Sequence, residues 1–266
     1  TNRKNDLCEM IKAAFFDIDG TLLSFKTHKV SQGTVCAFHK LHNKGIRTFI
    51  SSGRPQVLIP EMPVTFDGYV TMNGGYCFVG DKVLLKNPIP QQETERWLAY
   101  AEERGLCTMI FTEKQMFVNT LDDPMGNAIR DQLDFEMPPL LPIAQMHGQE
   151  TYQIIAVMDA DKDQEVLDML PHCRLPRWHP HFSDLINRDN SKAAGIESIL
   201  RHFGLNRDEC IGFGDGGNDI EMLEYCGIGV AMGNASDEVK AHADYVTTSV
   251  DDEGIEHALS ELKIVD

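Results

Sequence analysis

The sequence alternates between apolar runs of strand length and amphipathic stretches of helical period, first over its N-terminal part and again near its C-terminus. Residues 13–16, 46–50 and 210–213 are mostly apolar and lead directly into polar loops, as the buried strands of a parallel sheet do. Residues 30–43 place apolar side chains three residues apart on one helical face. This alternation predicts an α/β fold with a doubly wound parallel sheet, whose strands end at one common edge.

The middle of the chain has a different pattern. The elements expected there are hairpins at 76–86 and 107–117, helices at 91–104, 122–133 and 161–170, and strands at 152–158 and 173–178. A proline-rich run at 137–142 must be a connection between elements. We therefore expect two domains: a core formed by residues 1–83 and 185–266, and an inserted α+β domain formed by residues 84–184.

Composition and charge narrow the class of protein. The chain of 266 residues is 42% hydrophobic and 24% charged, as ordinary globular proteins are. Its formal net charge of −17 argues against nucleic acid and anionic membranes as partners, because both are negatively charged. No apolar run is long enough to span a bilayer, and the polar residues 1–9 contain no signal-peptide core, so we expect a cytoplasmic protein. The seven scattered cysteines are never spaced as Cys-x-x-Cys, which indicates reduced thiols rather than disulfides or a zinc site.

The first apolar run ends in two carboxylates that stand two positions apart, Asp17 and Asp19, followed by Gly20 and Thr21. Because alternate side chains of a strand point the same way, both carboxylates are expected on one face where the strand ends. Two like charges this close resist joint ionisation, so a cation lies between them, or one of them stays protonated, or both. A strand that ends in an ordinary Asp-Gly turn would have the same sequence. The choice between a ligand site and a turn therefore depends on the other motifs of the chain.

Further polar residues follow the other predicted strands or begin the helices after them. The residues expected to gather at the sheet edge are Asp17, Asp19, Thr21, Ser52, Lys192, Asp215, Asn218 and Asp219. Acids that suit Mg²⁺, together with a lysine and hydroxyl groups that suit a phosphate dianion, are the combination that phosphoryl transfer requires. Taken singly, each of these residues has a competing interpretation. Ser51 and Ser52 fit ordinary turn residues, and Lys192 fits an ordinary surface lysine. The spacing does not decide which of the two serines faces the ligand.

A competing motif runs through the same region. Gly212, Gly214 and Gly217 match the G-x-G-x-x-G fingerprint of dinucleotide-binding loops. We reject this interpretation because Asp215 lies inside the loop and Asp219 lies at the start of the following helix. A pyrophosphate would meet two negative charges there, whereas carboxylate oxygens suit a divalent cation.

Four ordered motifs resemble those of a known family. The motifs are Asp17-Ile18-Asp19-Gly20-Thr21, Ser52-Gly53-Arg54, Lys192 within residues 191–196, and Gly214-Asp215-Gly216-Gly217-Asn218-Asp219. They resemble motifs I to IV of the haloacid dehalogenase superfamily, and residues 230–235 resemble its Cof-type branch. Within that branch the chain looks most like bacterial hexose-phosphate phosphatases. The resemblance spans nearly the whole chain, is weakest across the insertion, and implies a Rossmann-like core with an inserted cap.

The resemblance also implies a role for each motif residue. Asp17 would be the nucleophile that forms an aspartyl-phosphate, and Asp19 would be the general acid and then the general base. The residues implied for the Mg²⁺ site are Asp17, Asp19 through its carbonyl, Asp215 and, near the metal, Asp219. The residues implied to hold the phosphoryl group are Thr21, Ser52, Gly53, Lys192 and Asn218. Relatives often carry Thr where this chain has Ser52, and the serine hydroxyl serves equally.

Substrate specificity is expected from the inserted domain, which resembles the cap that closes over the leaving group, and from the loop after the third strand. The specificity candidates are Arg54, Asn73, Gly74, His179, His181 and Asp184. The last three lie near Trp178 and are candidates for contacts with sugar hydroxyls, and packing at the hinge is the competing interpretation. A metal site is not indicated there, because no Cys or acidic residue completes a recognisable ligand pattern with the two histidines.

The expected activity is Mg²⁺-dependent hydrolysis of small phosphate monoesters, with hexose phosphates as substrates. The expected partner is therefore a small phosphorylated metabolite, with no nucleic acid and no membrane, and we expect a monomer. A phosphomutase, which returns the phosphoryl group to its substrate, is the alternative enzyme. A phosphoacceptor module such as a response-regulator receiver is the alternative outside the enzymes. Such a module needs neither an acid two residues after its phosphorylated Asp nor a large insertion.

Overall fold

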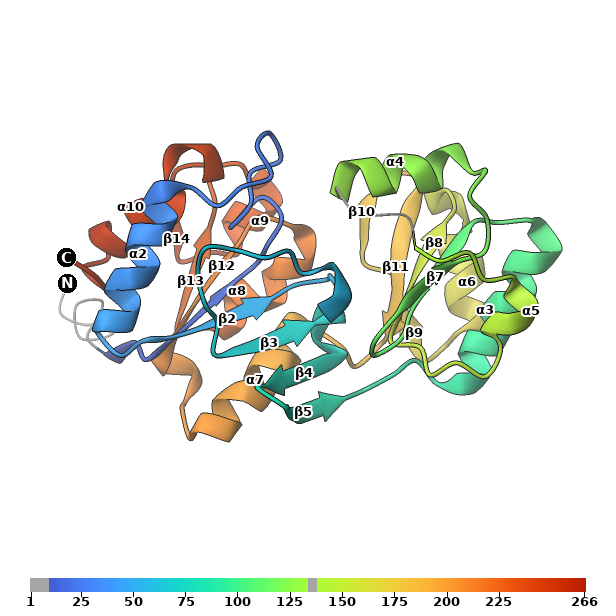
Figure 1. Cartoon of the computed structure of the whole chain (residues 1–266), viewed down its shortest axis with the longest axis horizontal. Coiled ribbons are helices and arrows are strands. Elements are labelled where there is room, and N and C mark those ends of the chain that lie inside the picture. The colour runs from blue at the N-terminus through green and yellow to red at the C-terminus, as the bar shows by residue number, and fades with distance from the viewer. Residues whose placement is uncertain (1–9, 134–137) are drawn as a thin grey trace. The chain divides into compact units, whose positions relative to one another are not determined.

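A computed structural model describes residues 10–133 and 138–266 of the chain, and these residues divide into two units (Figure 1). The first unit contains the described residues up to Gly53 together with Pro60–Leu85 and Ser191–Asp266. The second contains Arg54–Ile59 and the described part of Lys86–Asn190. The insertion thus ends at Asn190 rather than at residue 184, where the sequence placed its end, because a strand continues through that position.

The first unit is built on an eight-stranded sheet with the strand order β14-β13-β12-β1-β2-β3-β4-β5. The strands are β1 Ala13–Phe16, β2 Arg47–Ser51, β3 Gly68–Thr71, β4 Tyr76–Val79, β5 Lys82–Lys86, β12 Cys210–Gly214, β13 Ile228–Ala231 and β14 Tyr245–Val246. Neighbouring strands from β14 to β3 are parallel, whereas β3 and β4 are antiparallel. Strand β1 therefore lies between β12 and β2, which come from opposite sides of the insertion. The predicted doubly wound parallel sheet is confirmed.

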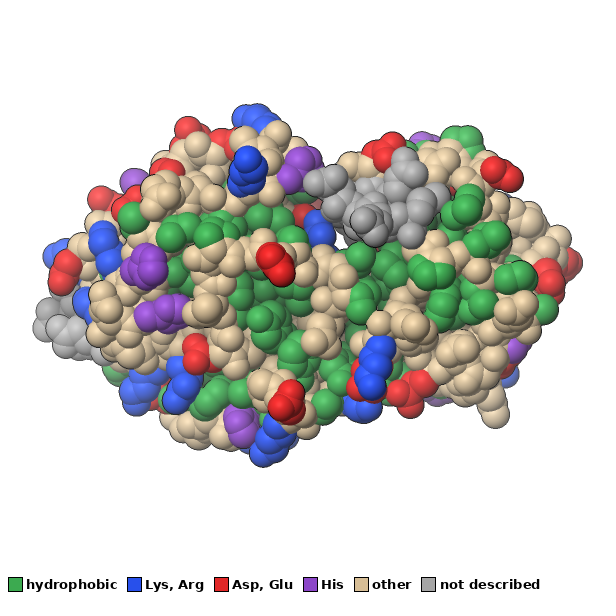
Figure 2. Space-filling view, in the orientation of Figure 1, with side chains coloured by type: hydrophobic (Ala, Val, Ile, Leu, Met, Phe, Trp, Pro, Cys, Tyr) green, Lys and Arg blue, Asp and Glu red, His purple; other side chains and the backbone are tan. Residues whose placement is uncertain are grey.

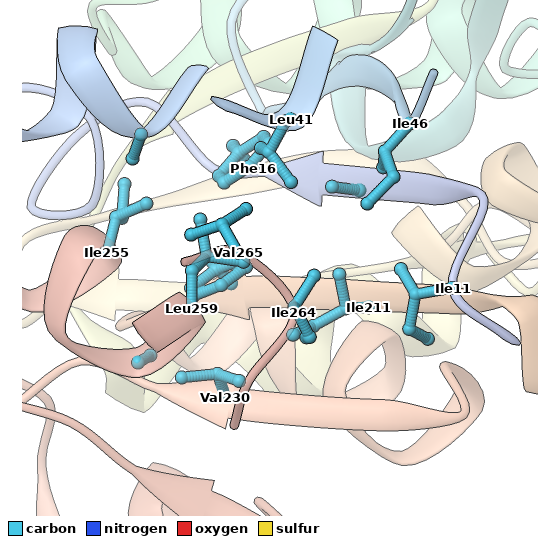
Figure 3. Close-up of a cluster of buried hydrophobic side chains, with 14 of the residues drawn as sticks. Ile11, Phe16, Leu41, Ile46, Ile211, Val230, Ile255, Leu259, Ile264 and Val265 are labelled. Atoms are coloured by element: carbon cyan, nitrogen blue, oxygen red, sulfur yellow. The ribbon is translucent and has the colours of Figure 1, made fainter. Parts of the chain in front are cut away.

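Helices cover both faces of this sheet. Successive side chains of β1 point in opposite directions, so its apolar residues are buried on each face by a different set of helices. The helices of the unit are α2 Gln32–Asn43, α7 Lys192–Phe203, α8 Ile220–Tyr225, α9 Asp237–Ala241 and α10 Gly254–Glu261. Phe16 packs into a buried cluster with side chains of α2 and α10, including Leu41 and Leu259 (Figure 3). Phe15 packs into a second cluster with side chains of α7 and α8, including Ile196. Burying one such large apolar side chain contributes about 1.5–3 kcal/mol, so both faces hold β1 in place.

Serine caps fix where two of these helices begin. The side chain of Ser31 accepts a hydrogen bond from the backbone N–H of Thr34 at the start of α2. The side chain of Ser191 accepts one from the N–H of Ala194 at the start of α7. Such a cap satisfies one of the free N–H groups of the first turn and is worth about 1 kcal/mol. The cap at Ser191 makes Lys192 the first residue of its helix.

The second unit is an antiparallel sheet with helices. Its strand order is β10-β11-β8-β6-β7, and β9 pairs with β11. The strands are β6 Thr108–Phe111, β7 Met116–Val118, β8 Gln153–Val157, β9 Cys173–Arg174, β10 Arg177–His179 and β11 Phe182–Asn187, and the helices are α3 Gln91–Arg104, α4 Pro124–Leu133, α5 Ile143–Met146 and α6 Asp163–Met169. Trp97, Ile110, Ile154 and Leu185 belong to its buried core.

Asparagine side chains join the two ends of the second unit. Asn87 donates through Nδ2 to Asn190 Oδ1 at 2.7 Å, and Asn190 donates through Nδ2 to the carbonyl of Asn87 at 3.0 Å. Asn187 donates through Nδ2 to Asn87 Oδ1 at 3.2 Å and to the carbonyl of Pro88 at 2.9 Å. The segment that enters the unit and the segment that leaves it therefore lie side by side.

Three general expectations from the sequence concern the chain as a whole. Among the described residues, no helix combines the length and the apolar character that crossing a bilayer demands. On the face shown in Figure 2, Lys and Arg side chains are scattered among acidic and other side chains. The described cysteines carry free thiols. Residues 1–9, which include Cys8, and residue 137 of the proline-rich run lie outside the described residues.

Candidate functional site

The candidate residues of the first unit come from loops at the carboxyl ends of its strands and from the start of α7. Asp17 follows β1, Ser52 follows β2 and Asn73 lies just after β3. Asp215 follows β12, which neighbours β1. Because these strands are parallel, their carboxyl ends meet at one edge of the sheet, and the loops that follow them converge there.

Lys192 lies at the centre of the site and is completely buried, with 0% of its surface exposed. Its ammonium nitrogen donates to Asp17 Oδ1 at 2.6 Å and to Asp219 Oδ1 at 2.5 Å. Burial alone would lower the pKa of Lys192, but the two carboxylates outweigh burial and raise this pKa above its ordinary value. Lys192 is therefore a charged, buried partner of two acids and not a solvated surface lysine.

Asp17, Asp215 and Asp219 form a compact acidic group. Each offers a carboxylate oxygen, and these oxygens lie within 4.8 Å of one another. Burial, and then the neighbouring acids, raise the pKa of Asp17 well above its ordinary value against the opposing effect of Lys192. Burial, followed by the charge of Asp219, raises the pKa of Asp215 to about 7. Three carboxylates face one ammonium group, so this set of hard oxygen donors fits a divalent cation.

Both oxygens of Asp219 are engaged by groups of the protein itself. Oδ1 accepts from Lys192, while Oδ2 accepts from the backbone N–H groups of Asp215 at 3.0 Å and Gly216 at 2.9 Å. The amides that a pyrophosphate would need in a dinucleotide-binding loop are thus bound to this carboxylate. A Cβ atom on Gly214 would lie 2.4 Å from Cγ of Asp219, so the glycine there serves close packing.

Asp215 is held from two sides. The hydroxyl of Thr21, which is buried, donates to Asp215 Oδ1 at 3.1 Å. The side-chain amide of Asn234 donates to Asp215 Oδ2 at 3.0 Å. The sequence assigned Thr21 to the phosphoryl group, and in the structure its hydroxyl is directed to the carboxylate of Asp215.

The loop after β3 also belongs to the site. Asn218 donates through Nδ2 to Asn73 Oδ1 at 3.0 Å, and the N–H of Asn73 donates to the carbonyl of Ser52 at 3.1 Å. Gly74 has a φ of +87°, and a Cβ atom there would lie 1.9 Å from the carbonyl oxygen of Ser191. Only glycine permits this approach, which packs the loop against the start of α7. Asn73 and Gly74 are thereby fixed beside the phosphate-binding candidates.

The remaining candidates of the first unit flank this centre. Asp19 is half-buried in the loop after β1, and its charge contributes to the raised pKa values of Asp17 and Asp215. Ser51 is the last residue of β2, and its buried hydroxyl has no hydrogen-bond partner among the described residues. Ser52, the first residue after the strand, is nearly buried and remains the predicted phosphate ligand. Gly53 follows it, and a Cβ atom there would lie 3.2 Å from Nδ2 of Asn73.

Four candidates belong to the second unit, and the contacts below lie within it. Arg54 donates through a guanidinium nitrogen to the carbonyl of Leu58 at 2.8 Å. The ring of His179 stacks on Phe182 with centroids 4.3 Å apart. His181 Nδ1 lies 2.5 Å from Asp159 Oδ1, and Asp184 is nearly buried on β11. The side chain of Trp178 lies outside the described part. A role for these residues in specificity stays a prediction.

Sequence reasoning did not single out Asn234, although this residue contacts the site directly. It follows β13 at the same edge of the sheet, with Met232 and Gly233 between them. The rule that ligand-binding residues follow parallel strands would have included it. Asn234 lies within residues 230–235, which resemble the Cof-type branch, but sequence reasoning assigned it no role of its own, because a single Asn after a Gly is common in turns.

Comparison with known proteins gives concordant results. Residues 14–259 match the family of haloacid dehalogenase-like hydrolases. The chain is 31% identical over 256 residues to "Putative phosphatase YkrA" of Bacillus subtilis strain 168, covering 96% of this chain and 98% of that protein. It is 27% identical over 276 residues to the 5-amino-6-(5-phospho-D-ribitylamino)uracil phosphatase YitU of the same strain, covering 92% and 95% of the two chains. The structure of BT4131, a HAD subclass IIB sugar phosphatase, is similar with a TM-score of 0.90 and 39% identity, covering 96% of this chain and 100% of that one.

Proposed function

Because this chain belongs to the haloacid dehalogenase-like hydrolases, we propose that it is a Mg²⁺-dependent phosphatase that hydrolyses small phosphate monoesters, with hexose phosphates as its substrate class. The observation that carries the proposal is the buried Lys192, which pairs with Asp17 and Asp219 beside Asp215. The similarity to a sugar phosphatase at 39% identity supports the choice of substrate class. The expectation of a cytoplasmic monomer is part of the same proposal.

The donor set fits Mg²⁺ by charge and by chemistry. Three carboxylates against one ammonium leave two negative charges, which a divalent cation balances. Asp17 and Asp215, with the carbonyl of Asp19, would hold the ion, and Asp219 would stay beside it. When bound, Mg²⁺ supplies charge neutralisation for the phosphoryl oxygens. It would also lower the raised pKa of Asp17, so that this residue is ionised for attack.

The chain's own residues account for the two chemical steps. A carboxylate oxygen of Asp17 forms a bond to phosphorus while the ester P–O bond breaks, and Asp19 gives a proton to the leaving alkoxide oxygen. A water molecule then loses a proton to Asp19 and bonds to phosphorus, the bond from phosphorus to Asp17 breaks, and phosphate is released. Lys192, at 2.6 Å, holds the nucleophile in one orientation. Ser52 and Asn218 would bind the phosphoryl oxygens.

The inserted unit would act as the cap that excludes water and contacts the leaving group. Its candidates are Arg54, His179, His181 and Asp184. Asn73 and Gly74 would meet the substrate from the loop after β3, which their packing keeps rigid. In this arrangement the first unit performs the chemistry and the second selects the substrate.

The decisive experiment compares the wild type with D17N and D208N. Asp208 is an exposed Asp at the opposite end of β12 from Asp215, so D208N controls for the loss of a surface carboxylate. Phosphate release is followed with Mg²⁺ on p-nitrophenyl phosphate and on a panel of phosphorylated metabolites that includes hexose 1-phosphates. The wild type and D208N should turn over many times, D17N should not, and chelation should stop the reaction.

Other outcomes would identify the alternatives. Wild-type turnover in D17N would exclude Asp17 as the nucleophile. Isomerised hexose phosphate without free phosphate would identify a mutase. One phosphorylation per chain without turnover would identify a phosphoacceptor.

A further inference from the structure

Asn234 joins three parts of the first unit that are far apart in the sequence. Its Nδ2 donates to Asp215 Oδ2 at 3.0 Å and to the carbonyl of Gly20 at 2.9 Å. Its Oδ1 accepts from the backbone N–H of Val250 at 2.9 Å. The residue is exposed, so its orientation is fixed by these three hydrogen bonds and not by packing in a core.

We propose that Asn234 is a positioning residue that holds the carboxylate of Asp215 in the orientation in which it binds the divalent cation. This inference rests on the metal site of the proposed function and adds to it a residue outside the four motifs, within the run 230–235 to which the sequence assigned no role. Carboxylate ligands of metals are commonly held by hydrogen bonds from a surrounding layer of residues, and removing such a partner costs about 10–100-fold in metal affinity or activity.

The orientation of the amide follows from its partners. A backbone N–H can only donate, so the oxygen of the Asn234 side chain must face Val250. The nitrogen then faces two oxygens that can only accept, those of Gly20 and of ionised Asp215. Each of the two donors of the amide has a partner, and the group cannot flip without losing all three hydrogen bonds.

The carboxylate of Asp215 is clamped as a result. Thr21 donates to one oxygen and Asn234 to the other, so rotation about the bond that carries the carboxylate breaks both contacts. Gly20 reinforces this geometry, because it lies so close that a Cβ atom on it would stand 2.1 Å from Asp215 Oδ2. Without Asn234, one oxygen of this partly exposed carboxylate would turn to solvent.

The anchor of Asn234 is itself tied to the loop after β1. Val250 begins a 3-10 turn, and Asp251 in that turn accepts a hydrogen bond from the hydroxyl of Ser24 at 2.6 Å. Asp251 also forms an ion pair with Lys26 at 2.6 Å. The segment after β14 therefore braces both the loop that carries Asp19 and the amide that holds Asp215. A displacement of this brace should reach the metal site through Asn234.

The test measures Mg²⁺ binding directly, by titration calorimetry on the full-length protein freed of metal, without substrate. The N234A variant should raise the dissociation constant of Mg²⁺ about 10–100-fold. S236A is the control in the same loop: it removes the N-cap of α9 and leaves Asp215 untouched. Its thermal midpoint should fall while its Mg²⁺ affinity stays that of the wild type.

A second variant tests the anchor. V250P removes the donor to Asn234 Oδ1, and proline suits the first position of the turn, since Ser249 before it is extended. It should weaken Mg²⁺ binding in the same direction as N234A, by a smaller factor.

Three results would overturn the inference: wild-type Mg²⁺ affinity in N234A, an equal loss in S236A, or wild-type Mg²⁺ affinity in V250P. Phosphate release by the wild type is scored separately. A failure of the proposed function is therefore distinguishable from a failure of this inference.

Discussion

Replacing Lys192 by methionine should destabilise the metal-free protein at neutral pH far more than an ordinary lysine substitution. Methionine has a similar length and no charge, so the change removes the ammonium with little change in volume. Asp17 and Asp219 then remain buried, 7% and 0% exposed, without the cation that pairs with both. Removing one partner of a buried ion pair costs about 3–5 kcal/mol, because the other charge stays desolvated. With two acids affected, we expect the upper part of that range.

The effect should depend on pH with a defined sign. The pKa of Asp17 already lies above its ordinary value in the folded wild type, and removing Lys192 raises this pKa further. An acid whose pKa is raised by folding stabilises the folded state when it is protonated, and this contribution disappears as the pH rises through the folded-state pKa. The loss in K192M should therefore be largest at pH 8 and smaller at pH 5, where the carboxylate of Asp17 can take up a proton.

Urea unfolding with a chelator present measures the loss of stability in K192M at each pH. For a loss of 3–5 kcal/mol, the midpoint should fall by about 1–2 M urea. Far-UV circular dichroism follows both units, whereas both tryptophans, Trp97 and Trp178, belong to the second unit, so their fluorescence reports on that unit. The matched control is K12M, which breaks an ion pair of equal length, 2.5 Å, formed by a lysine side chain that is 61% exposed. Exposed pairs contribute little to stability. If K192M and K12M had the same midpoint at pH 8, the account of the buried site would be refuted.

Two further changes test other parts of the site. Folding raises the pKa of Asp215 to about 7 by burial and by Asp219, so its stabilising contribution is complete below about pH 4 and lost as the pH rises through 7. Relative to D215N, the metal-free wild type should therefore lose on the order of 3 kcal/mol between pH 4.5 and pH 8, and a pH-independent difference in urea unfolding would contradict the assignment. G74A should lower the free energy of unfolding by about 2–5 kcal/mol, because φ at this position is +87° and the new methyl group would lie 1.9 Å from the Ser191 carbonyl oxygen. An unchanged thermal midpoint would show that the loop moves to accept the methyl group.

The parts of the site that could be predicted from the sequence are those that depend on local pattern. Asp17 and Asp215 each follow an apolar run, and parallel strands bring their ends to one edge whatever the details of the packing. Lys192 could be placed because Asn190 and Ser191 before it are both residues that commonly cap a helix, and the structure has the cap at Ser191. The partners of individual side chains were not predictable in this way. Thr21 and Asp215 are 194 positions apart, and which acceptor the hydroxyl of Thr21 takes depends on distances that only the folded chain defines.

Secondary-structure prediction failed where a strand is buried on both faces and so shows no alternation of polar and apolar residues. Strand β11 was not anticipated, because all six of its residues are buried although Ser, Asp and Asn occur among them. A strand buried on both faces shows no alternation of polar and apolar residues, and its letters resemble those of a loop. The end of the insertion was placed too early for the same reason. The short helix α5 was not predicted, because four residues are too few to show a helical period.

The asparagine contacts at the base of the second unit have a consequence for how such a protein can diverge. Since Asn87 and Asn190 touch, the intervening stretch starts and finishes at nearly the same point in space. Whatever is enclosed between them can grow, shrink or be exchanged for a foreign module without stretching the scaffold that holds the reactive acids. Under the proposed function, selectivity and chemistry would be encoded in separable parts of one gene, and new preferences would arise by remodelling the enclosed stretch alone.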